Sequence, residues 1–144
     1  MAECASVKSS LSTSCLESAL ASLDRAFLIR YKKLGQTHVD TVETLNKIAR
    51  VQTKQRNYLD ARKSYYEVLK LREAIFGRTH PCVAVTAQTL ATIHTRLFQV
   101  KEASFFFRVA LTVLEHNGLQ RHSLADAIRK DLNDLSLMQT RYEI

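Results

Sequence analysis

Three histidines recur at a constant spacing along this 144-residue chain, and imidazole is the side chain that most often binds transition metals. His38, His80 and His122 are separated by 42 residues each. One zinc ion needs its ligand atoms ~2 Å away, whereas successive layers of packed helices lie ~10 Å apart. The spacing therefore argues against a metal site, and we expect these histidines in loops or at the starts of helices.

Cys82 follows His80 closely, and a thiol beside an imidazole could act as a nucleophile. The position 42 residues earlier is Asp40, however, so the pair belongs to a repeated segment and not to a catalytic arrangement. The sequence also has no Gly-rich phosphate loop, no HExxH motif and no nucleophile elbow. It predicts a protein that is not an enzyme and that uses no metal or other cofactor.

The composition predicts an all-α protein. Hydrophobic residues make up 46% and charged residues 24% of the chain, a globular balance, while only three Gly and one Pro are available for turns. No apolar stretch approaches the ~20 residues of a membrane span. Three widely spaced cysteines and the lack of a secretory leader favour a reducing compartment, so we expect a cytoplasmic protein.

The residues around the histidines repeat at the same offset of 42. The segment Leu34–His38 reads LGQTH, and Phe76–His80 reads FGRTH. Small and aromatic residues follow at matching positions, which are Ala49 and Ala91, Ala61 and Ala103, and Tyr65 and Phe107. Internal periods of this length are typical of stacked helical repeats.

Each period predicts two helices. Apolar residues recur at helical spacing, and the repeats are expected at about 41–75 and 82–116, with half-repeats at about 15–33 and 122–142. Asp40, with Glu43 three residues on, is the expected capping box of one helix, and Ser123 with Asp126 has the same spacing. Residues 1–14 are only weakly periodic, and we expect a weakly ordered segment there.

The repeats resemble the tetratricopeptide repeat, whose small residues allow two antiparallel helices to approach closely. The 42-residue period and the phrases TLNKIARV, EVLKLREAIFG and RTHP are similar to the kinesin light chain subtype, which nephrocystin-like arrays share. The resemblance covers about residues 15–135. It implies a single domain over 1–144, a right-handed α-solenoid of about six helices arranged as antiparallel pairs.

The resemblance also implies a binding surface. In this class the first helix of each pair lines a concave groove that receives a peptide. Asn46 matches the asparagine that bonds a peptide backbone in repeats of this kind, and Gln88 offers the same amide chemistry. The groove residues that the resemblance predicts are Asn46, Lys47, Arg50, Lys54, Gln88, Thr92, Arg96 and Lys130.

The charge of these positions favours an acidic partner. The chain has a formal net charge of +7, most of it within residues 1–72, and five of the predicted groove residues are basic. A positive lining suits an acidic or acidic-flanked peptide. The alternative is that these are ordinary solvated charges on helix surfaces, and the sequence leaves both open.

A second surface is suggested by apolar residues outside the repeat pattern. Phe105 and Phe106 correspond to Lys63 and Ser64 of the earlier repeat, so they indicate an additional contact within the chain or with another protein. Leu137 and Met138 occupy groove-type positions of the last helix. These four residues form a candidate docking surface.

Three functions follow, in order of preference. The first is a protein-interaction module that binds a peptide or protein segment in its groove. The second is a structural subunit permanently docked in a larger assembly through the second surface. Nucleic-acid binding by the basic half is least favoured, because no stacking surface or nucleic-acid motif accompanies the charge. No small-molecule substrate is expected.

Overall fold

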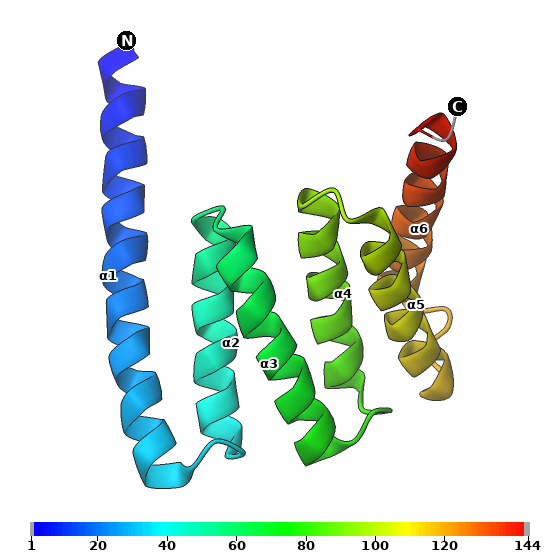
Figure 1. Ribbon diagram of the computed structural model, residues 1–144, viewed down its shortest axis with the longest axis horizontal. Coiled ribbons are helices and arrows are strands. Elements are labelled where there is room, and N and C mark those ends of the chain that lie inside the picture. The colour runs from blue at the N-terminus through cyan, green and yellow to red at the C-terminus, as the bar shows by residue number, and fades with distance from the viewer. Residues whose placement is uncertain (1, 143–144) are drawn as a thin grey trace. The chain divides into compact units, whose positions relative to one another are not determined.

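The computed structural model describes residues 2–142, and side chains over 13–141, and all of its regular elements in this range are helices. The all-α prediction is confirmed, with six helices packed in adjacent pairs (Figure 1). Their bounds are α1 Ala2–Leu34, α2 Val39–Lys54, α3 Tyr58–Phe76, α4 Pro81–Arg96, α5 Val100–His116 and α6 Ser123–Tyr142.

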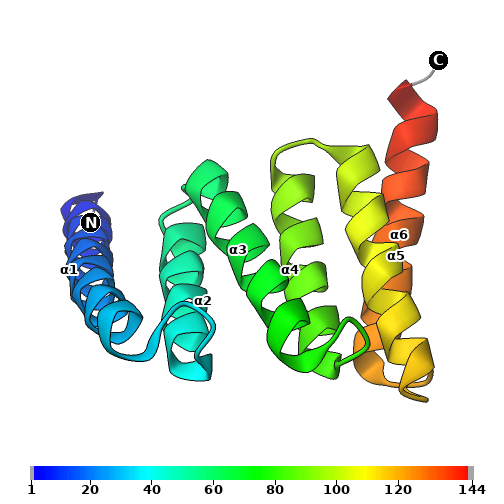
Figure 2. The same ribbon diagram turned by 60° about the horizontal axis from the view of Figure 1, so that its bottom comes forward.

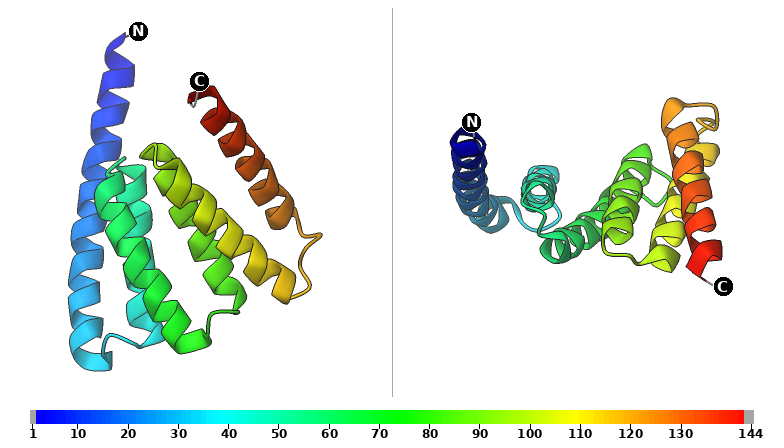
Figure 3. Two further views of the ribbon diagram at one scale, coloured as in Figure 1. Left: turned by 45° about the vertical axis from the view of Figure 1, so that its right-hand side comes forward. Right: turned by 90° about the horizontal axis from the view of Figure 1, so that it is seen from above.

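The chain divides into two compact units, Met1–Ser64 and Tyr65–Ile144. In the first unit α1 and α2 pack side by side and run in opposite directions (Figure 3). In the second unit α4 packs on α5, and α6 lies against α5 (Figure 2). Helix α1 begins at Ala2, well before the expected start near residue 15, and extends past the end of α2.

The repeated histidines start three of the helices. His38, His80 and His122 immediately precede α2, α4 and α6, and each Nδ1 accepts a backbone N–H two residues on at 3.2 Å. The prediction of helix-start histidines is confirmed, whereas Asp40 and Ser123 are not the N-caps that we expected. The imidazole already satisfies the free N–H that a cap must bind, and both expected residues lie inside the first turn.

An arginine–threonine contact recurs at the same offset of 42. In the first unit Arg30 Nη1 donates to Thr44 Oγ1, and in the second unit Arg72 Nη1 donates to Thr86 Oγ1 at 2.7 Å. Each threonine hydroxyl in turn donates to the carbonyl four residues earlier in its own helix. The third pair at these positions is apolar and buried, namely Leu114 and Ile128.

One pair of positions is occupied by different kinds of side chain in the two repeats. In the first unit Ser64 Oγ donates to Gln52 Oε1 at 2.7 Å. The residues 42 positions on are Phe106 and His94, and their rings stack at 9° with centroids 5.4 Å apart. The same place between two helices is therefore filled by a hydrogen bond in one repeat and by a pair of rings in the next.

Small side chains allow α4 and α5 to approach closely. Ala84, Ala87 and Ala91 on α4 and Ala103 and Ala110 on α5 are fully buried. Larger side chains fill the remaining space, and the completely buried ones in the second unit include Leu90, Ile93, Phe107 and Ile128. Because alanine side chains are short, the two helix backbones can approach closely, and the larger side chains pack between the helices at the density typical of protein interiors.

Candidate functional site

The exposed face of α2 carries the basic residues predicted for a groove in the first unit. Lys47, Arg50 and Lys54 are exposed at positions i, i+3 and i+7, and therefore follow one side of the helix. Asn46 is half-buried beside them. This basic face, as we call these four residues, offers three cations and one amide that can both donate and accept.

A cavity of about 280 Å³ lies between α4 and α6 in the second unit. Thr92 and Arg96 of α4 face Met138 of α6 across it, so three predicted residues come together. The whole lining consists of Thr92, Thr95, Arg96, Phe107, Asp131, Asp134, Leu135 and Met138. We call it the α4–α6 cavity.

Three other predicted residues lie outside this lining. Gln88 is half-buried on α4, Lys130 is exposed on α6, and Leu137 is 62% exposed next to Met138. Thr92 lines the cavity, and its hydroxyl donates to the Gln88 carbonyl at 3.0 Å. Its oxygen keeps lone pairs with which it can accept a bond from a ligand.

The charge of the α4–α6 cavity differs from the positive lining that we expected. Arg96 is its one basic residue, and Asp131 and Asp134 are both acidic. Lys130, on which the expectation relied, does not contribute to the lining. The positive surface is thus a property of α2, while this cavity has mixed charge with a slight acidic excess.

Two apolar residues of the lining were not among the predicted site residues. Phe107 is almost completely buried on α5, and Leu135 is buried on α6; together they provide an apolar floor. Their helical spacing marks them as core residues, and no sequence signal separates a core side chain from one that also lines a cavity. The cavity combines this floor with a polar rim, as ligand sites do.

The predicted docking surface is only partly exposed. Phe105 is 61% exposed and Met138 51%, but Phe106 is buried at 7%. Phe106 is held by a stack on His94 and an edge-to-face contact with Tyr66, whose ring centroid is 5.4 Å away. It is therefore a packing residue of the second unit. Of the two contacts that the sequence left open, within the chain or with another protein, the first applies to Phe106, which does not belong to the docking surface.

Neither metal binding nor membrane insertion gains support from the described residues. In that part of the chain no three His, Cys, Asp or Glu side chains are grouped so that they could hold a metal ion. No described helix combines the length and the apolar character needed to cross a membrane.

Comparison with known families gives one match, to "Tetratricopeptide repeat", over residues 40–116. This match spans more than half of the chain, from the start of α2 to the end of α5. No curated protein matches the sequence.

Solved structures with the same fold include tetratricopeptide arrays of the kinesin light chain type. A Podosopora anserina structure of "kinesin light chain nearly identical TPR-like repeats" is 17% identical, with a TM-score of 0.75 over 86% of this chain and 59% of its own. A singly substituted variant of that protein is 16% identical, with a TM-score of 0.78 over 92% and 62%. BtubC (BKLC) from P. vanneervenii is 14% identical, with a TM-score of 0.65 over 88% and 59%. The chain thus spans about three-fifths of these structures.

Proposed function

Because this chain belongs to the tetratricopeptide repeat family, we propose that it is a non-catalytic module that holds a segment of a partner protein. Tetratricopeptide domains are generally protein-interaction modules, and the fold is usually non-catalytic. The proposed segment lies against the first helices of the repeats and carries acidic residues where it meets α2.

One observation carries this proposal, the basic face of α2. Three exposed cations on one side of a helix attract acidic groups, and their long side chains can reach several positions of a ligand. Asn46 adds hydrogen bonding to the ligand backbone, since its amide can pair with a peptide unit whatever side chain that unit bears. The basic face therefore suits an acidic segment held partly through its backbone.

The α4–α6 cavity supports the same proposal from the second unit. Its floor of Phe107 and Leu135 suits an apolar side chain, and its aspartates disfavour a uniformly acidic segment there. Each unit is thus proposed to favour its own ligand chemistry, acidic residues at α2 and an apolar or basic residue at the cavity.

Reversing one charge on the basic face tests the proposal. Arg50→Glu should weaken binding of labelled Glu-rich peptides about tenfold, because it removes one attraction and adds one repulsion. Fluorescence anisotropy at two salt concentrations measures the effect, and the loss should be smaller at high salt. Asn46→Ala should weaken the binding of acidic and neutral peptides equally, because the amide is proposed to bond the peptide backbone.

Lys63→Glu is the matched control. Lys63 is an exposed cation on α3 in the same unit, and it lies on the second helix of its pair. If Lys63→Glu weakened binding as much as Arg50→Glu, net charge alone would explain the affinity and the proposed site would be wrong.

Exposed apolar residues favour a second candidate, a structural subunit docked in a larger assembly. Phe98 is 91% exposed in the turn after α4, and Phe105 and Leu137 are more than half exposed. Exposed aromatic and aliphatic side chains of this kind are frequent at protein interfaces. The two candidates differ in whether the chain alone is a stable monomer.

A further inference from the structure

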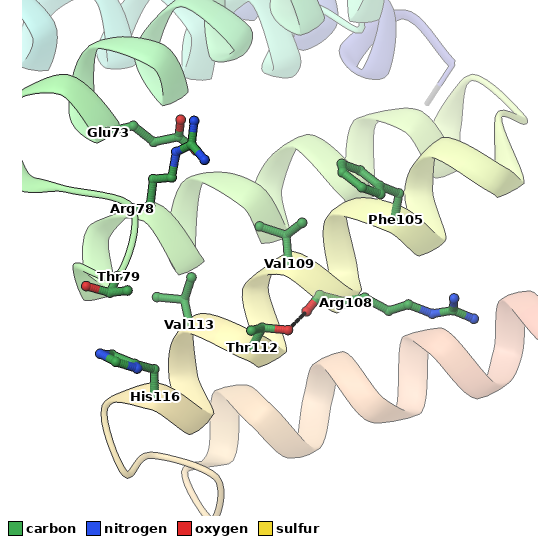
Figure 4. Close-up of a pocket in the computed structure, with 9 residues that line it drawn as sticks. All are labelled: Glu73, Arg78, Thr79, Phe105, Arg108, Val109, Thr112, Val113 and His116. Atoms are coloured by element: carbon green, nitrogen blue, oxygen red, sulfur yellow. Dashed lines mark hydrogen bonds between the residues drawn. The ribbon is translucent and has the colours of Figure 1, made fainter.

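A larger cavity, of about 720 Å³, lies on α5 in the second unit (Figure 4). One wall is a stripe of α5 that contains Phe105, Val109 and Val113, at positions i, i+4 and i+8. The other wall comes from Glu73 at the end of α3 and from Thr79 in the following loop. The lining residues belong to second helices of repeats and the loop after one of them, so this cavity is separate from the predicted groove.

Two of the three stripe positions have different chemistry in the previous repeat, and the third is apolar in both, since Val113 corresponds to Leu71. The residues of α3 that lie 42 positions before Phe105, Val109 and Thr112 are Lys63, Glu67 and Lys70. Two oppositely charged residues four positions apart are an ordinary solvent-facing pattern. Helix α3 is therefore an example, within the same chain, of the second helix of a repeat with a solvent-exposed outer face.

This internal comparison shows that the repeat fold does not require apolar residues at the positions of Phe105 and Val109. An α3 with Lys63, Glu67 and Lys70 folds into the same kind of helix, and Lys70 is exposed. On α5 the same outer face presents Phe105 at 61% exposure and a half-buried Val109. Exposing apolar groups costs free energy that a charged face would avoid, so their presence points to a contact with another molecule.

The charges around the cavity indicate which end of a ligand is acidic. The lining includes two arginines, Arg78 and Arg108, and one acidic residue, Glu73, so its net charge is positive. Arg108 extends away from the other lining side chains, at the outer edge of the cavity (Figure 4). A carboxylate of the ligand is therefore favoured near Arg108.

The dimensions fit a short helix. Phe105 and Val113 are eight positions apart on α5, or ~12 Å at 1.5 Å per residue, which is about two helical turns. Amphipathic helices bind such grooves with anchors at i, i+3, i+4 and i+7. The volume falls within the range of ~300–1,000 Å³ that is usual for ligand sites.

We propose that the α5 cavity binds an amphipathic helix of a partner protein, with its apolar side on Phe105 and Val109, over the buried Val113, and an acidic residue near Arg108. This site goes beyond the segment binding proposed above, because it uses other helices and other chemistry. Either site could exist without the other.

A synthetic helical peptide with a leucine face and glutamates elsewhere is the probe, and the same peptide with lysines is its matched control. Fluorescence anisotropy should show that the glutamate peptide binds the native chain about tenfold more tightly than the lysine peptide. Amide NMR shifts should map the glutamate peptide to α5. Arg108→Glu should reverse the preference between the two peptides.

The decisive variant gives α5 the outer face of α3, through Phe105→Lys, Val109→Glu and Thr112→Lys together. It should keep its helical circular dichroism, because α3 folds with these residues, and lose binding at least about tenfold. Phe105→Lys alone changes one exposed side chain and should weaken binding in the same direction. Lys63→Glu, at an exposed residue outside both cavities and outside the basic face, should leave this affinity unchanged.

Three results would overturn the proposal. The first is equal binding of both peptides, or no binding of the glutamate peptide, by the native chain. The second is unchanged affinity in the folded triple variant, or NMR shifts in the α4–α6 cavity instead of α5. The third is a concentration-dependent dimer of the native chain that the triple variant abolishes, because the occupant would then be a second copy.

Discussion

At the scale of single residues, the repeated arginine–threonine contact shows how the interior tolerates a polar group. Arg72 is only 8% exposed, and its guanidinium reaches the Thr86 hydroxyl at 2.7 Å. A buried cation needs acceptors, because leaving it without them costs more than the bond itself contributes. The apolar pair Leu114 and Ile128 fills the corresponding place without that requirement.

The two side chains of this contact should be energetically coupled. Thr86→Val keeps the shape but takes one acceptor from Arg72, and should lower the free energy of unfolding by about 1–3 kcal/mol. Arg72→Leu combined with Thr86→Val should be less destabilising than the sum of the single changes. Urea unfolding of the four proteins measures the coupling, and strictly additive values would show that the two side chains act independently.

At the scale of helices, the caps set where the first helix of each repeat begins. The imidazole of His122 accepts the N–H of Leu124 at the start of α6, and this helix packs mainly on α5 within the second unit. The cap stabilises the start of α6, because the first N–H groups of a helix have no partner within it.

Loss of that cap should open the start of α6. His122→Ala should weaken the first turn by about 1 kcal/mol, and its amides should exchange hydrogen about fivefold faster. Hydrogen exchange read by mass spectrometry measures this directly. His122→Asn supplies a side-chain oxygen at the same place and should retain the native rate, whereas equal acceleration in both variants would exclude a capping role.

Helix positions could be predicted from the sequence, and several side-chain roles could not. The bounds of α3 and α5 follow from apolar spacing, because a helix that buries one face repeats its apolar residues every three to four positions. The burial of Phe106 could not be predicted, since it depends on Tyr66 and His94 of two other helices. The mixed charge of the α4–α6 cavity likewise arises only when Arg96 meets Asp131 and Asp134 across a space.

The turns between paired helices carry a further regularity. Arg56 and Phe98, 42 residues apart, both adopt positive φ, at 59° and 60°. This left-handed region costs a residue with a Cβ roughly 1–2 kcal/mol, and glycine usually occupies it. The chain's three glycines instead take positive φ after α1, α3 and α5. The second-unit turn thus holds an exposed aromatic, Phe98, in a strained conformation.

At the scale of the whole molecule, one face of α6 is polar where the corresponding face of α4 is apolar and buried. Ala84, Ala87 and Ala91 of α4 are fully buried, and 42 residues later the chain has Asp126, Arg129 and Asn133. Asp126 and Arg129 form a salt bridge at 3.1 Å. The face of α6 toward α5 stays apolar through Ala125, Ile128 and Leu135, so polarity changes on one side only.

The size of the free protein distinguishes the two candidate functions. A segment-binding module should elute as a monomer of 16.4 kDa and melt cooperatively, because it needs no partner in order to fold. Size-exclusion chromatography with light scattering makes the measurement. Aggregates, or a broad melting transition, would contradict a chain that is stable alone. They would favour the docked subunit, with Phe98 and Phe105 as the expected contacts with the assembly.

The helices that pack within each unit are consecutive along the chain, α1 with α2, α4 with α5, and α5 with α6. A ribosome therefore releases each helix shortly before the helix on which it packs. Structure of this kind can form while synthesis is still in progress, because no early segment of these pairs must wait for a distant one. The growing chain would bury each apolar stripe soon after it emerges and expose little of it to the crowded cell.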